Sequence, residues 1–377
     1  MQVFVPKETR KGELRVPMTP ETVKKLVSKG ADIVVEAGMG LACGYTDAAF
    51  EGGGAKVSGA RAEMLGAADL VLRLNEPEPD EVRQLKPGAI HVSYLDPFNK
   101  QHLLDEFMNR GVSAIAMEMI PRTTLAQKMD ALSSQANLAG YVAVVLAASR
   151  MPIVMPMMMT PAGTLKPARV FIIGCGVAGL QAIATAKRLG ARVEAFDTRP
   201  VVEEQVLSLG AKFVKIDLGE TGQTKDGYAL ELTEGQKEMQ KEGMAKVIAQ
   251  SDVVITTAQV FGKKAPVIVT EAMVRAMRPG SVVVDCAVDT GGNVACVKPG
   301  EETEVGGVRV IGFYNLPGRV PVHASQMYAA NVASLVEHFW DKESKSFKLK
   351  LEDEIMRGCL VVHEGELRNE MLKKARN

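Results

Sequence analysis

Short runs of apolar residues alternate with amphipathic stretches along nearly the whole chain. In the first third of the sequence, apolar runs typical of buried strands occupy residues 2–5, 31–36, 68–74, 89–95 and 113–119. Between these runs, residues 20–28 and 100–110 have the spacing of amphipathic helices, and a glycine follows each of them closely. Because strands and helices alternate, the pattern predicts a parallel sheet with helices on both of its faces.

A long, mostly apolar stretch at residues 125–149 predicts one helix that links this region to a second wound domain. Further strand-like runs follow it at residues 169–173, 192–196, 212–216, 252–257, 281–286 and 308–311. Six strands is the count of a complete dinucleotide-binding fold. Residues 217–246 interrupt the pattern and are rich in Gly, Glu, Gln and Lys. This interruption fits either a mobile lid or a plain surface helix over residues 230–246.

The C-terminal region is predicted to cross back onto the first domain. The helix expected after His323 carries one apolar stripe typical of core packing, formed by Tyr328, Val332, Leu335, Val336 and Phe339. Residues 346–350 and 360–363 are predicted to pair as a terminal hairpin. The chain is therefore assigned to the α/β class, with two doubly wound parallel-sheet domains. The predicted domains are residues 1–135 plus 325–377, and residues 136–324.

Composition narrows the classes of partner. The chain has 377 residues, with 45 basic and 45 acidic side chains, so its net charge is zero and gives no reason to expect nucleic acid or an anionic membrane surface. Aromatic residues make up only 5%, which argues against a platform for stacking bases. Residues 138–159 are the most apolar stretch, but Arg150, Pro152 and Pro156 interrupt it, so no membrane span is expected. The start of the chain turns charged too soon for a secretory signal.

The five cysteines show no C-x-x-C spacing, and the five histidines do not cluster near them. We therefore expect reduced cysteines in the core of a cytosolic protein and no metal site.

A glycine-rich turn carries the strongest chemical signal. It reads Gly174-Cys-Gly176-Val177-Ala178-Gly179, between an expected strand and an expected helix. In that context the glycines permit a tight turn and close approach of a pyrophosphate, and the helix N-terminus offers free N–H groups. The motif predicts that the second domain is a Rossmann domain that binds a dinucleotide; a purely structural glycine-rich turn is the alternative.

The residues after the second strand of this domain predict which dinucleotide binds. Asp197 lies 18 residues beyond Gly179 and is placed to accept hydrogen bonds from the adenosine ribose hydroxyls. Its charge would repel a 2′-phosphate, which favours NAD over NADP. Thr198 and Arg199 follow it, and an arginine at this place could tolerate the phosphate.

Other strand ends should line the same cleft, since ligands of open α/β sheets bind at the carboxyl ends of strands. Gln259 follows the fourth strand of the second domain, and residues 285–292 follow the fifth. Asp289 in that second turn fits a catalytic role and a turn-forming role equally well.

A 2-amino or 2-hydroxy acid dehydrogenase needs an arginine for the substrate carboxylate and a His or Lys acid/base. Arg15 could hold a carboxylate. The expected strand ends of the first domain, however, carry Asn75 and Asp96, and neither is a His or Lys.

Several segments resemble the alanine dehydrogenase and transhydrogenase superfamily over essentially the whole chain. They are Pro6-Lys-Glu8, Arg15-Val16, Thr19-Pro20, the turn at 174–179 and residues 285–292. In alanine dehydrogenases a lysine and a histidine occupy the places that look like Asn75 and Asp96 here. This departure argues against an amino-acid dehydrogenase.

Residues 121–141 resemble the arginine–glutamine–aspartate loop of the NAD(H)-binding component of proton-translocating transhydrogenases, which holds the dihydronicotinamide. Arg122, Gln127 and Asp130 carry that pattern and are the catalytic candidates, and Ser133 of the same segment joins them as a cofactor ligand. Residues 226–229, with Gly227 and Tyr228, are similar to the tip of that family's mobile loop, which closes over the nucleotide.

The resemblance implies an NAD(H)-binding component that transfers a hydride directly to NADP(H) bound by a partner component. It also implies a homodimer, a membrane-embedded proton-translocating partner, and a cytoplasmic location peripheral to the inner membrane through those partners. Hydride transfer between two nicotinamides exchanges no proton at the reacting carbons, which agrees with the missing acid/base. The alternatives are a self-contained amino-acid dehydrogenase, which would turn over alanine or pyruvate alone, and an NAD-sensing module, which would bind NADH without transferring hydride.

Overall fold

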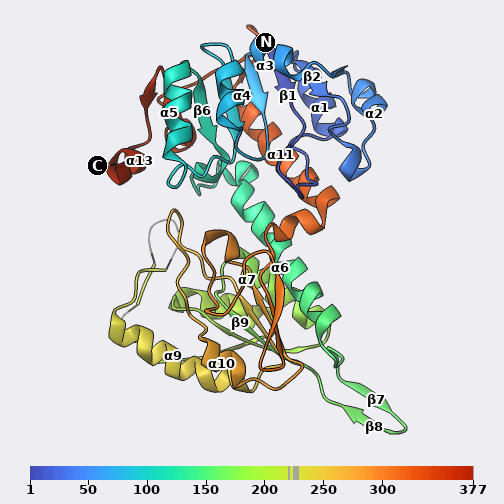
Figure 1. The fold of residues 1–377 in the computed structure, drawn as a ribbon, viewed down its shortest axis with the longest axis vertical. Coiled ribbons are helices and arrows are strands. Elements are labelled where there is room, and N and C mark those ends of the chain that lie inside the picture. Colours follow the sequence, from blue (N-terminus) through green and yellow to red (C-terminus); the bar gives the residue numbers. More distant parts are fainter. Residues whose placement is uncertain (220, 224–228, 377) are drawn as a thin grey trace. The chain divides into compact units, whose positions relative to one another are not determined.

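The computed structural model describes residues 1–219, 221–223 and 229–376, and the chain forms two compact units (Figure 1). Unit 1 comprises Met1–Gln135 and Val320–Asn377, and unit 2 comprises Ala136–Arg319. The chain therefore leaves unit 1 for unit 2 and then returns to it, and each unit has its own sheet.

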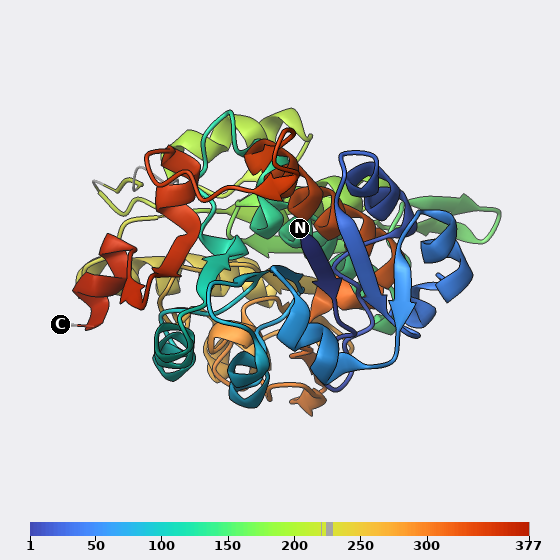
Figure 2. The same cartoon turned by 90° about the horizontal axis from the view of Figure 1, so that it is seen from above.

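The sheet of unit 1 has eight strands in the order β19-β18-β6-β5-β4-β1-β2-β3. Their bounds are β1 Gln2–Val5, β2 Asp32–Glu36, β3 Lys56–Ser58, β4 Leu70–Leu72, β5 Ile90–Ser93, β6 Ser113–Ala116, β18 Leu360–His363 and β19 Glu366–Leu367. Strands β1 to β6 run parallel, and β18 and β19 add an antiparallel edge. Helices cover both faces, so the predicted α/β wound class is confirmed for this unit (Figure 2).

The helices of unit 1 are α1 Pro20–Val27, α2 Asp47–Gly52, α3 Arg61–Ala67, α4 Pro79–Gln84, α5 Gln101–Arg110, α11 Pro321–Phe339, α12 Glu354–Cys359 and α13 Glu370–Arg376. Helices α3, α4 and α5 pack side by side, and α1 packs against α2 and α11. Helix α1 begins at a capping box formed by Thr19 and Thr22, with Pro20 in its first turn. The apolar stripe predicted for α11 is buried, which confirms that it packs into the core of this unit.

The sheet of unit 2 has the order β11-β10-β9-β12-β13-β15-β14. Its strands are β9 Arg169–Ile173, β10 Arg192–Phe196, β11 Lys212–Phe213, β12 Val253–Thr256, β13 Val282–Asp285, β14 Glu302–Val305 and β15 Val308–Ile311. Apart from the antiparallel edge strand β14, the strands are parallel in the order 3-2-1-4-5-6 of a dinucleotide-binding fold. The prediction of a Rossmann fold is therefore confirmed.

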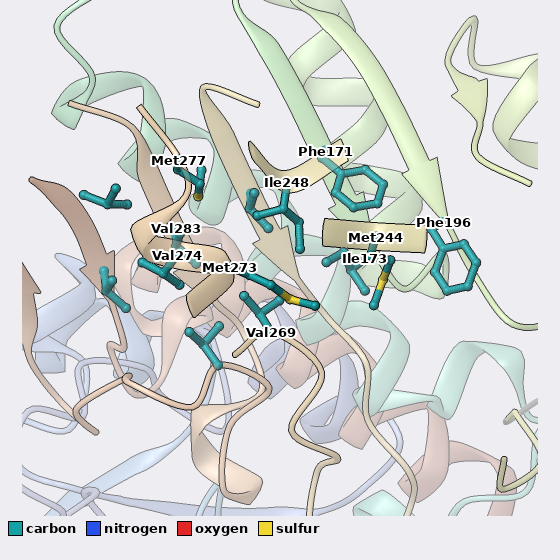
Figure 3. Close-up of a cluster of buried hydrophobic side chains, with 14 of the residues drawn as sticks. Phe171, Ile173, Phe196, Met244, Ile248, Val269, Met273, Val274, Met277 and Val283 are labelled. Atoms are coloured by element: carbon teal, nitrogen blue, oxygen red, sulfur yellow. The ribbon is translucent and has the colours of Figure 1, made fainter. Parts of the chain in front are cut away.

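The helices that follow in the chain are α6 Ala131–Arg150, which contains the boundary between the units, α7 Val177–Arg188, α8 Glu203–Ser208, α9 Glu234–Ala249 and α10 Glu271–Arg275. Met244 and Ile248 of α9 and Met273 of α10 pack with strand residues such as Phe171 in one buried cluster (Figure 3). This cluster covers one face of the sheet. Of the interruption at residues 217–246, the part from Glu234 is helical, as the surface-helix alternative required. Residues 224–228, where the lid tip was expected, lie outside the described residues.

The predicted terminal hairpin is wrong. Strand β17, Ser346–Phe347, pairs with β16, Trp340–Asp341, whereas β18 pairs with β6 and β19. The reason is burial: Leu360, Val361 and Val362 are all inaccessible to solvent, so β18 needs cover on both faces and extends the main sheet. An isolated hairpin would leave one of these faces in water.

Helix α6 begins six residues later than predicted, at Ala131 instead of residue 125, because Asp130 caps it. Among the helices that the structure describes, it is the one whose length and composition would allow it to cross a membrane. One such helix is weak support for a span, since a core helix has the same length and composition. A second difference is the hairpin of β7, Met158–Thr160, and β8, Gly163–Leu165, which the apolar pattern did not predict.

Candidate active site

The glycine-rich turn lies between β9 and α7, where two parallel strands diverge in the sheet of unit 2. Gly174 has a φ of +92°, and a Cβ on Gly179 would lie 1.9 Å from the carbonyl oxygen of Gly174. A Cβ on Gly176 would meet no atom within 4 Å. The turn is therefore compact inside and open at Gly176, where a ligand could approach the backbone.

The first turn of α7 offers unpaired backbone donors. Gly176 is its N-cap residue and supplies no side-chain hydrogen bond. Val177 and Ala178 follow it and are half-buried. An N-terminus with this geometry binds anions, because several N–H groups point along the axis and the helix dipole favours negative charge. The predicted turn residues are thus together, and their arrangement fits a pyrophosphate.

Asp197 joins this turn to the end of β10. Its Oδ2 accepts the N–H of Cys175 at 2.7 Å. Arg199 donates from its backbone N–H and its Nε to Oδ1, at 2.8 and 2.9 Å, and from Nη2 to Oδ2 at 2.7 Å. The hydrogen bond to Asp197 raises the pKa of the Arg199 guanidinium. Half-buried Thr198 separates the two. Arg199 thus already occupies both carboxylate oxygens that were predicted to bind a ribose.

The loops after β12 and β13 are organised by a buried carboxylate. Asp285 accepts the N–H groups of Ala287, Asn293 and Val294 at 2.9, 2.7 and 2.9 Å. Burial raises the pKa of Asp285 although these N–H groups favour its charged form. Asn293 in turn bonds the backbone N–H and carbonyl of Ala258, so the two loops hold one another. Sequence reasoning missed both roles, because each rests on contacts between residues distant in the chain.

Two weaker candidates lie in these loops. Gln259 is exposed, and its Nε2 donates to the carbonyl of Cys286 at 3.3 Å. Asp289 is exposed and belongs to the 3-10 helix Val288–Thr290, which leaves both of its alternative roles open. Gly227 and Tyr228, predicted at the tip of the lid, lie outside the described residues.

The loop of residues 121–130 is held firmly at its base in unit 1. Ala126 and Met129 are buried, and the side chain of Asn331 on α11 donates to the carbonyl of Lys128 at 2.9 Å. Arg122 and Gln127 are exposed, and the Gln127 side chain makes no hydrogen bond within the described part of the chain. The loop thus presents an amide to solvent from a fixed backbone.

Asp130 lies where this loop enters α6. Its Oδ1 accepts the N–H of Ser133 at 2.8 Å, and its Oδ2 accepts the Ser133 hydroxyl at 2.6 Å. This is the geometry of an N-cap, in which the carboxylate satisfies a free helix donor and faces the positive end of the helix dipole. Arg122, Gln127, Asp130 and Ser133 are therefore brought together in one loop, and Asp130 has a structural task besides its predicted one.

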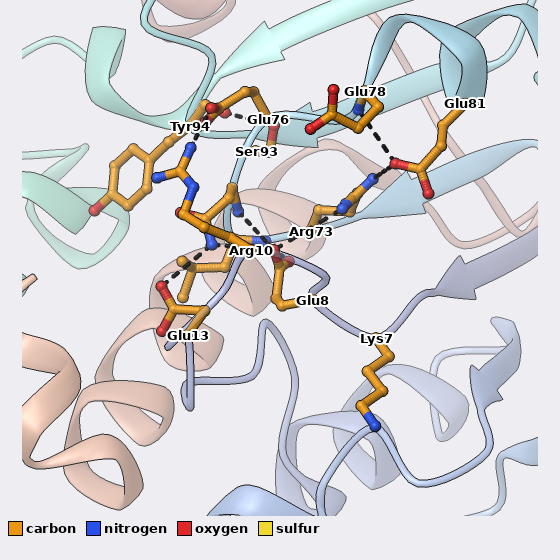
Figure 4. A network of polar contacts seen from close by, with 12 residues as sticks. Lys7, Glu8, Arg10, Glu13, Arg73, Glu76, Glu78, Glu81, Ser93 and Tyr94 are labelled. Atoms are coloured by element: carbon orange, nitrogen blue, oxygen red, sulfur yellow. Dashed lines mark hydrogen bonds and ion pairs between the residues drawn. The ribbon is translucent and has the colours of Figure 1, made fainter.

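The places expected for the acid/base of an amino-acid dehydrogenase are polar but lack an ammonium group (Figure 4). The Asn75 amide donates to Glu8 at 3.0 Å and to Glu13 at 3.2 Å. Arg15, the candidate for a substrate carboxylate, makes a two-fold contact with Glu13, from Nε at 2.8 Å and from Nη2 at 2.7 Å. A neutral amide between two glutamates can neither hold a substrate carboxylate by charge nor move a proton at neutral pH.

Other groups near these strand ends are also occupied. Asp96 has a φ of +48° and accepts the Asn99 amide at 2.8 Å, as part of the turn into α5. His91 lies inside β5, and burial lowers its pKa to about 3. Glu118, after β6, accepts the N–H groups of Leu95 and Asp96 at 2.8 and 2.6 Å, and burial raises its pKa to about 7. Sequence reasoning missed Glu118, because nothing local marks it as buried.

No cluster of three His, Cys, Asp or Glu side chains suited to a metal ion occurs among the residues whose placement is described.

Comparison with known proteins gives matches over the whole chain. Residues 4–139 match the alanine dehydrogenase/PNT N-terminal domain, and residues 143–370 match the C-terminal domain of the same family. An NAD(P) transhydrogenase subunit alpha of Rhodospirillum rubrum is 44% identical over 374 residues, which cover 97% of each chain. The alanine dehydrogenase of Halomonas elongata is 30% identical over 97% of this chain and 94% of its own. The solved structure of a transhydrogenase from Sinorhizobium meliloti superposes with a TM-score of 0.86 at 41% identity, over 98% of this chain and 100% of the other.

Proposed function

The chain belongs to the alanine dehydrogenase/PNT family, and within this family we propose that it is the NAD(H)-binding component of a proton-translocating NAD(P) transhydrogenase. Two relatives differ in their likeness to it: the transhydrogenase subunit at 44% identity and the alanine dehydrogenase at 30%. The observation that carries the choice is Asn75, which bonds Glu8 and Glu13 where the resemblance places a lysine in alanine dehydrogenases. The site is furnished for positioning and lacks that acid/base.

The chemistry is direct transfer of a hydride between C4 of the nicotinamide of NAD(H) and C4 of the nicotinamide of NADP(H). Such a transfer needs the two rings in contact, water excluded, and the ring and ribose held in place. We assign this holding to Arg122, Gln127 and Asp130, with Ser133 beside them. The exposed, unpaired amide of Gln127 supports its part, because an amide both donates and accepts hydrogen bonds.

The N–H groups at the start of α7 are assigned to the pyrophosphate, and Asp197 to the adenosine ribose. Because Arg199 occupies both oxygens of Asp197, ribose binding requires Arg199 to turn away or to share the carboxylate. This exchange keeps NAD(H) preferred, since the Asp197 carboxylate repels a 2′-phosphate. Gly227 and Tyr228 are assigned, from the resemblance alone, to a lid over the bound nucleotide.

The relatives are named subunit alpha, which implies partner subunits in a complex. We propose that these partners are an NADP(H)-binding component and a membrane-embedded proton-translocating component. The chain would then be cytoplasmic and attached to the inner membrane through them. Sedimentation of the chain with membranes that contain the partner, and its absence from membranes that lack it, tests this assignment.

We also propose that the chain forms a homodimer. The β7–β8 hairpin extends from unit 2 and exposes apolar side chains, with Met158 44%, Met159 78% and Leu165 49% accessible (Figure 1). Contiguous apolar exposure of this kind is typical of an interface. Sedimentation at micromolar concentration should give a dimer, and replacing residues 158–165 with a short polar turn should give a monomer. A wild-type chain that remains monomeric would contradict the proposal.

The chain incubated alone with NAD⁺ and alanine, or with NADH, pyruvate and ammonium, separates the two family members. The proposal predicts no turnover in either direction and predicts NADH binding in the same preparation. Steady turnover of alanine would establish the amino-acid dehydrogenase instead. Tight NADH binding without transfer to any acceptor, even with the partner present, would establish a sensing module.

A further inference from the structure

Helix α6 approaches helix α7 at Gly140 more closely than any side chain permits. A Cβ added to Gly140 would lie 2.1 Å from the carbonyl oxygen of Ala178 and 3.1 Å from the amide nitrogen of Ala182. All three residues belong to unit 2. Both of the threatened atoms are backbone, so no change of rotamer could relieve the overlap. The two helices would have to separate by more than 1 Å to reach an ordinary contact of 3.4 Å.

The contacted backbone is the first turn of the helix that opens the glycine-rich motif. The Ala178 carbonyl and the Ala182 N–H are the pair that an α-helix joins in its i to i+4 pattern, at the start of α7. The same turn is constrained from its other side. Gly179 abuts the carbonyl of Gly174, and the hydroxyl of Thr257 donates to that carbonyl at 2.9 Å. The nucleotide turn is thus fixed between two backbone contacts, and one of them comes from a helix outside the motif.

Helix propensity gives no reason for a glycine at this position. Gly140 lies inside the 20-residue helix α6 and is buried, with no positive φ. Alanine would stabilise such a helix more than glycine does. The close approach to α7 is the one requirement at this position that only glycine satisfies.

We infer that Gly140 is a positioning residue for NAD(H), which sets the place of the pyrophosphate-binding N–H groups of α7 through its contact with Ala178. The inference rests on the proposed function, because it assumes that the start of α7 binds the pyrophosphate. Gly140→Ala displaces the first turn of α7 relative to the sheet that carries Asp197. Ligands that contain a pyrophosphate therefore lose affinity, whereas a ligand that reaches only the adenosine end does not.

The test compares three ligands by equilibrium dialysis: NADH, ADP-ribose and adenosine. For Gly140→Ala, the dissociation constants of NADH and ADP-ribose should rise about tenfold to a hundredfold, the scale of an overpacked backbone contact. The constant for adenosine should change less than about threefold. A defect that merely loosened the fold would weaken all three ligands alike.

Two variants serve as controls. Gly66→Ala introduces the same methyl group into helix α3, where the new Cβ meets its nearest neighbour at an ordinary 3.6 Å, and should leave all three constants unchanged. Ala139→Gly weakens α6 without touching the contact and tests helix stability alone. If Ala139→Gly weakened NADH as much as Gly140→Ala, or if Gly140→Ala bound ADP-ribose normally, the inference would be overturned.

A measurement on the wild-type protein decides the case if Gly140→Ala does not fold. Hydrogen exchange in α6 around Gly140 should slow when ADP-ribose binds and stay unchanged with adenosine, because only the first ligand orders the start of α7. Equal protection by both ligands would overturn the inference. Failure of the wild type to bind NADH would instead contradict the proposed function, so the two failures are distinct.

Discussion

Replacing Gln127 with asparagine moves one amide and leaves its surroundings intact. Gln127 is exposed, and its side chain makes no hydrogen bond within the described ranges. The loop beneath it is held by buried Ala126 and Met129 and by the bond from Asn331 to the Lys128 carbonyl. The variant should therefore fold as stably as the wild type, to within about 0.5 kcal/mol. What changes is the reach of the amide, which shortens by one methylene, about 1.5 Å.

A displacement on this scale is large for a hydride donor. Misplacement of reacting groups by about 1 Å can cost on the order of a hundredfold in rate, equivalent to about 2.7 kcal/mol. Binding of NADH depends mainly on the turn at Gly174–Gly179 and on Asp197. Its affinity should therefore change by less than about tenfold, or about 1.4 kcal/mol. The signature is a large loss of rate with nearly unchanged binding.

Stopped-flow transfer to NADP⁺ on the purified partner component measures the rate, and NADH titration of the chain alone measures the affinity. Gln127→Glu keeps the reach but removes the N–H donors, so it separates position from donation. Lys128→Arg alters a neighbouring exposed side chain and should transfer hydride normally. If Gln127→Asn transferred hydride at the wild-type rate, the loop would be structural and its assignment to the nicotinamide would be withdrawn.

Three further variants test separate features of the site and the fold. Asp130→Asn keeps the N-cap of α6 and should lower hydride transfer alone, whereas Asp130→Ala should also cost about 1 kcal/mol of unfolding free energy. Denaturant unfolding beside the transfer assay checks this, and a wild-type rate for the asparagine variant would leave Asp130 as a cap only. Asp197→Asn should raise the affinity for NADPH relative to NADH in equilibrium dialysis, because the carboxylate that repels the 2′-phosphate is lost. Equal affinities of the wild type for the two cofactors would refute the role of Asp197. Burial raises the pKa of Glu118 from 4.5 to about 7, so the folded state holds its proton more tightly than the unfolded state. Wild-type stability should therefore fall relative to Glu118→Gln as the pH rises from 5 to 8. Parallel denaturation midpoints for the two proteins across that range would contradict it.

The strands that the sequence predicted best are the buried ones. The bounds of β1, β9, β10 and β15 agree with the predicted runs, because each strand is an apolar segment bounded by polar or turn residues. Strands β3 and β14 escaped prediction. Both lie at a sheet edge, and β14 reads Glu-Thr-Glu-Val, with no apolar run to mark it. The pairing of β18 depended on its burial in the complete sheet, which local spacing does not encode.

The candidate site divides in the same way. The turn at Gly174–Gly179 was predictable because its function depends on local spacing between a strand and a helix. The contacts of Asn293 with Ala258, of Asn331 with Lys128 and of Gly140 with Ala178 join residues far apart in the chain. A single sequence gives no signal for such pairs.

The most direct test of the central claim is a label-transfer experiment. NADH carrying deuterium at both C4 positions is mixed with this chain and an NADP(H)-binding transhydrogenase component loaded with NADP⁺, in ordinary water. Mass spectrometry of the NADPH formed then shows where its new hydrogen came from. Direct transfer predicts NADPH that carries one deuterium from the donor, with none lost to solvent. NADPH formed with solvent hydrogen, or no NADPH although NADH is bound, would contradict direct transfer.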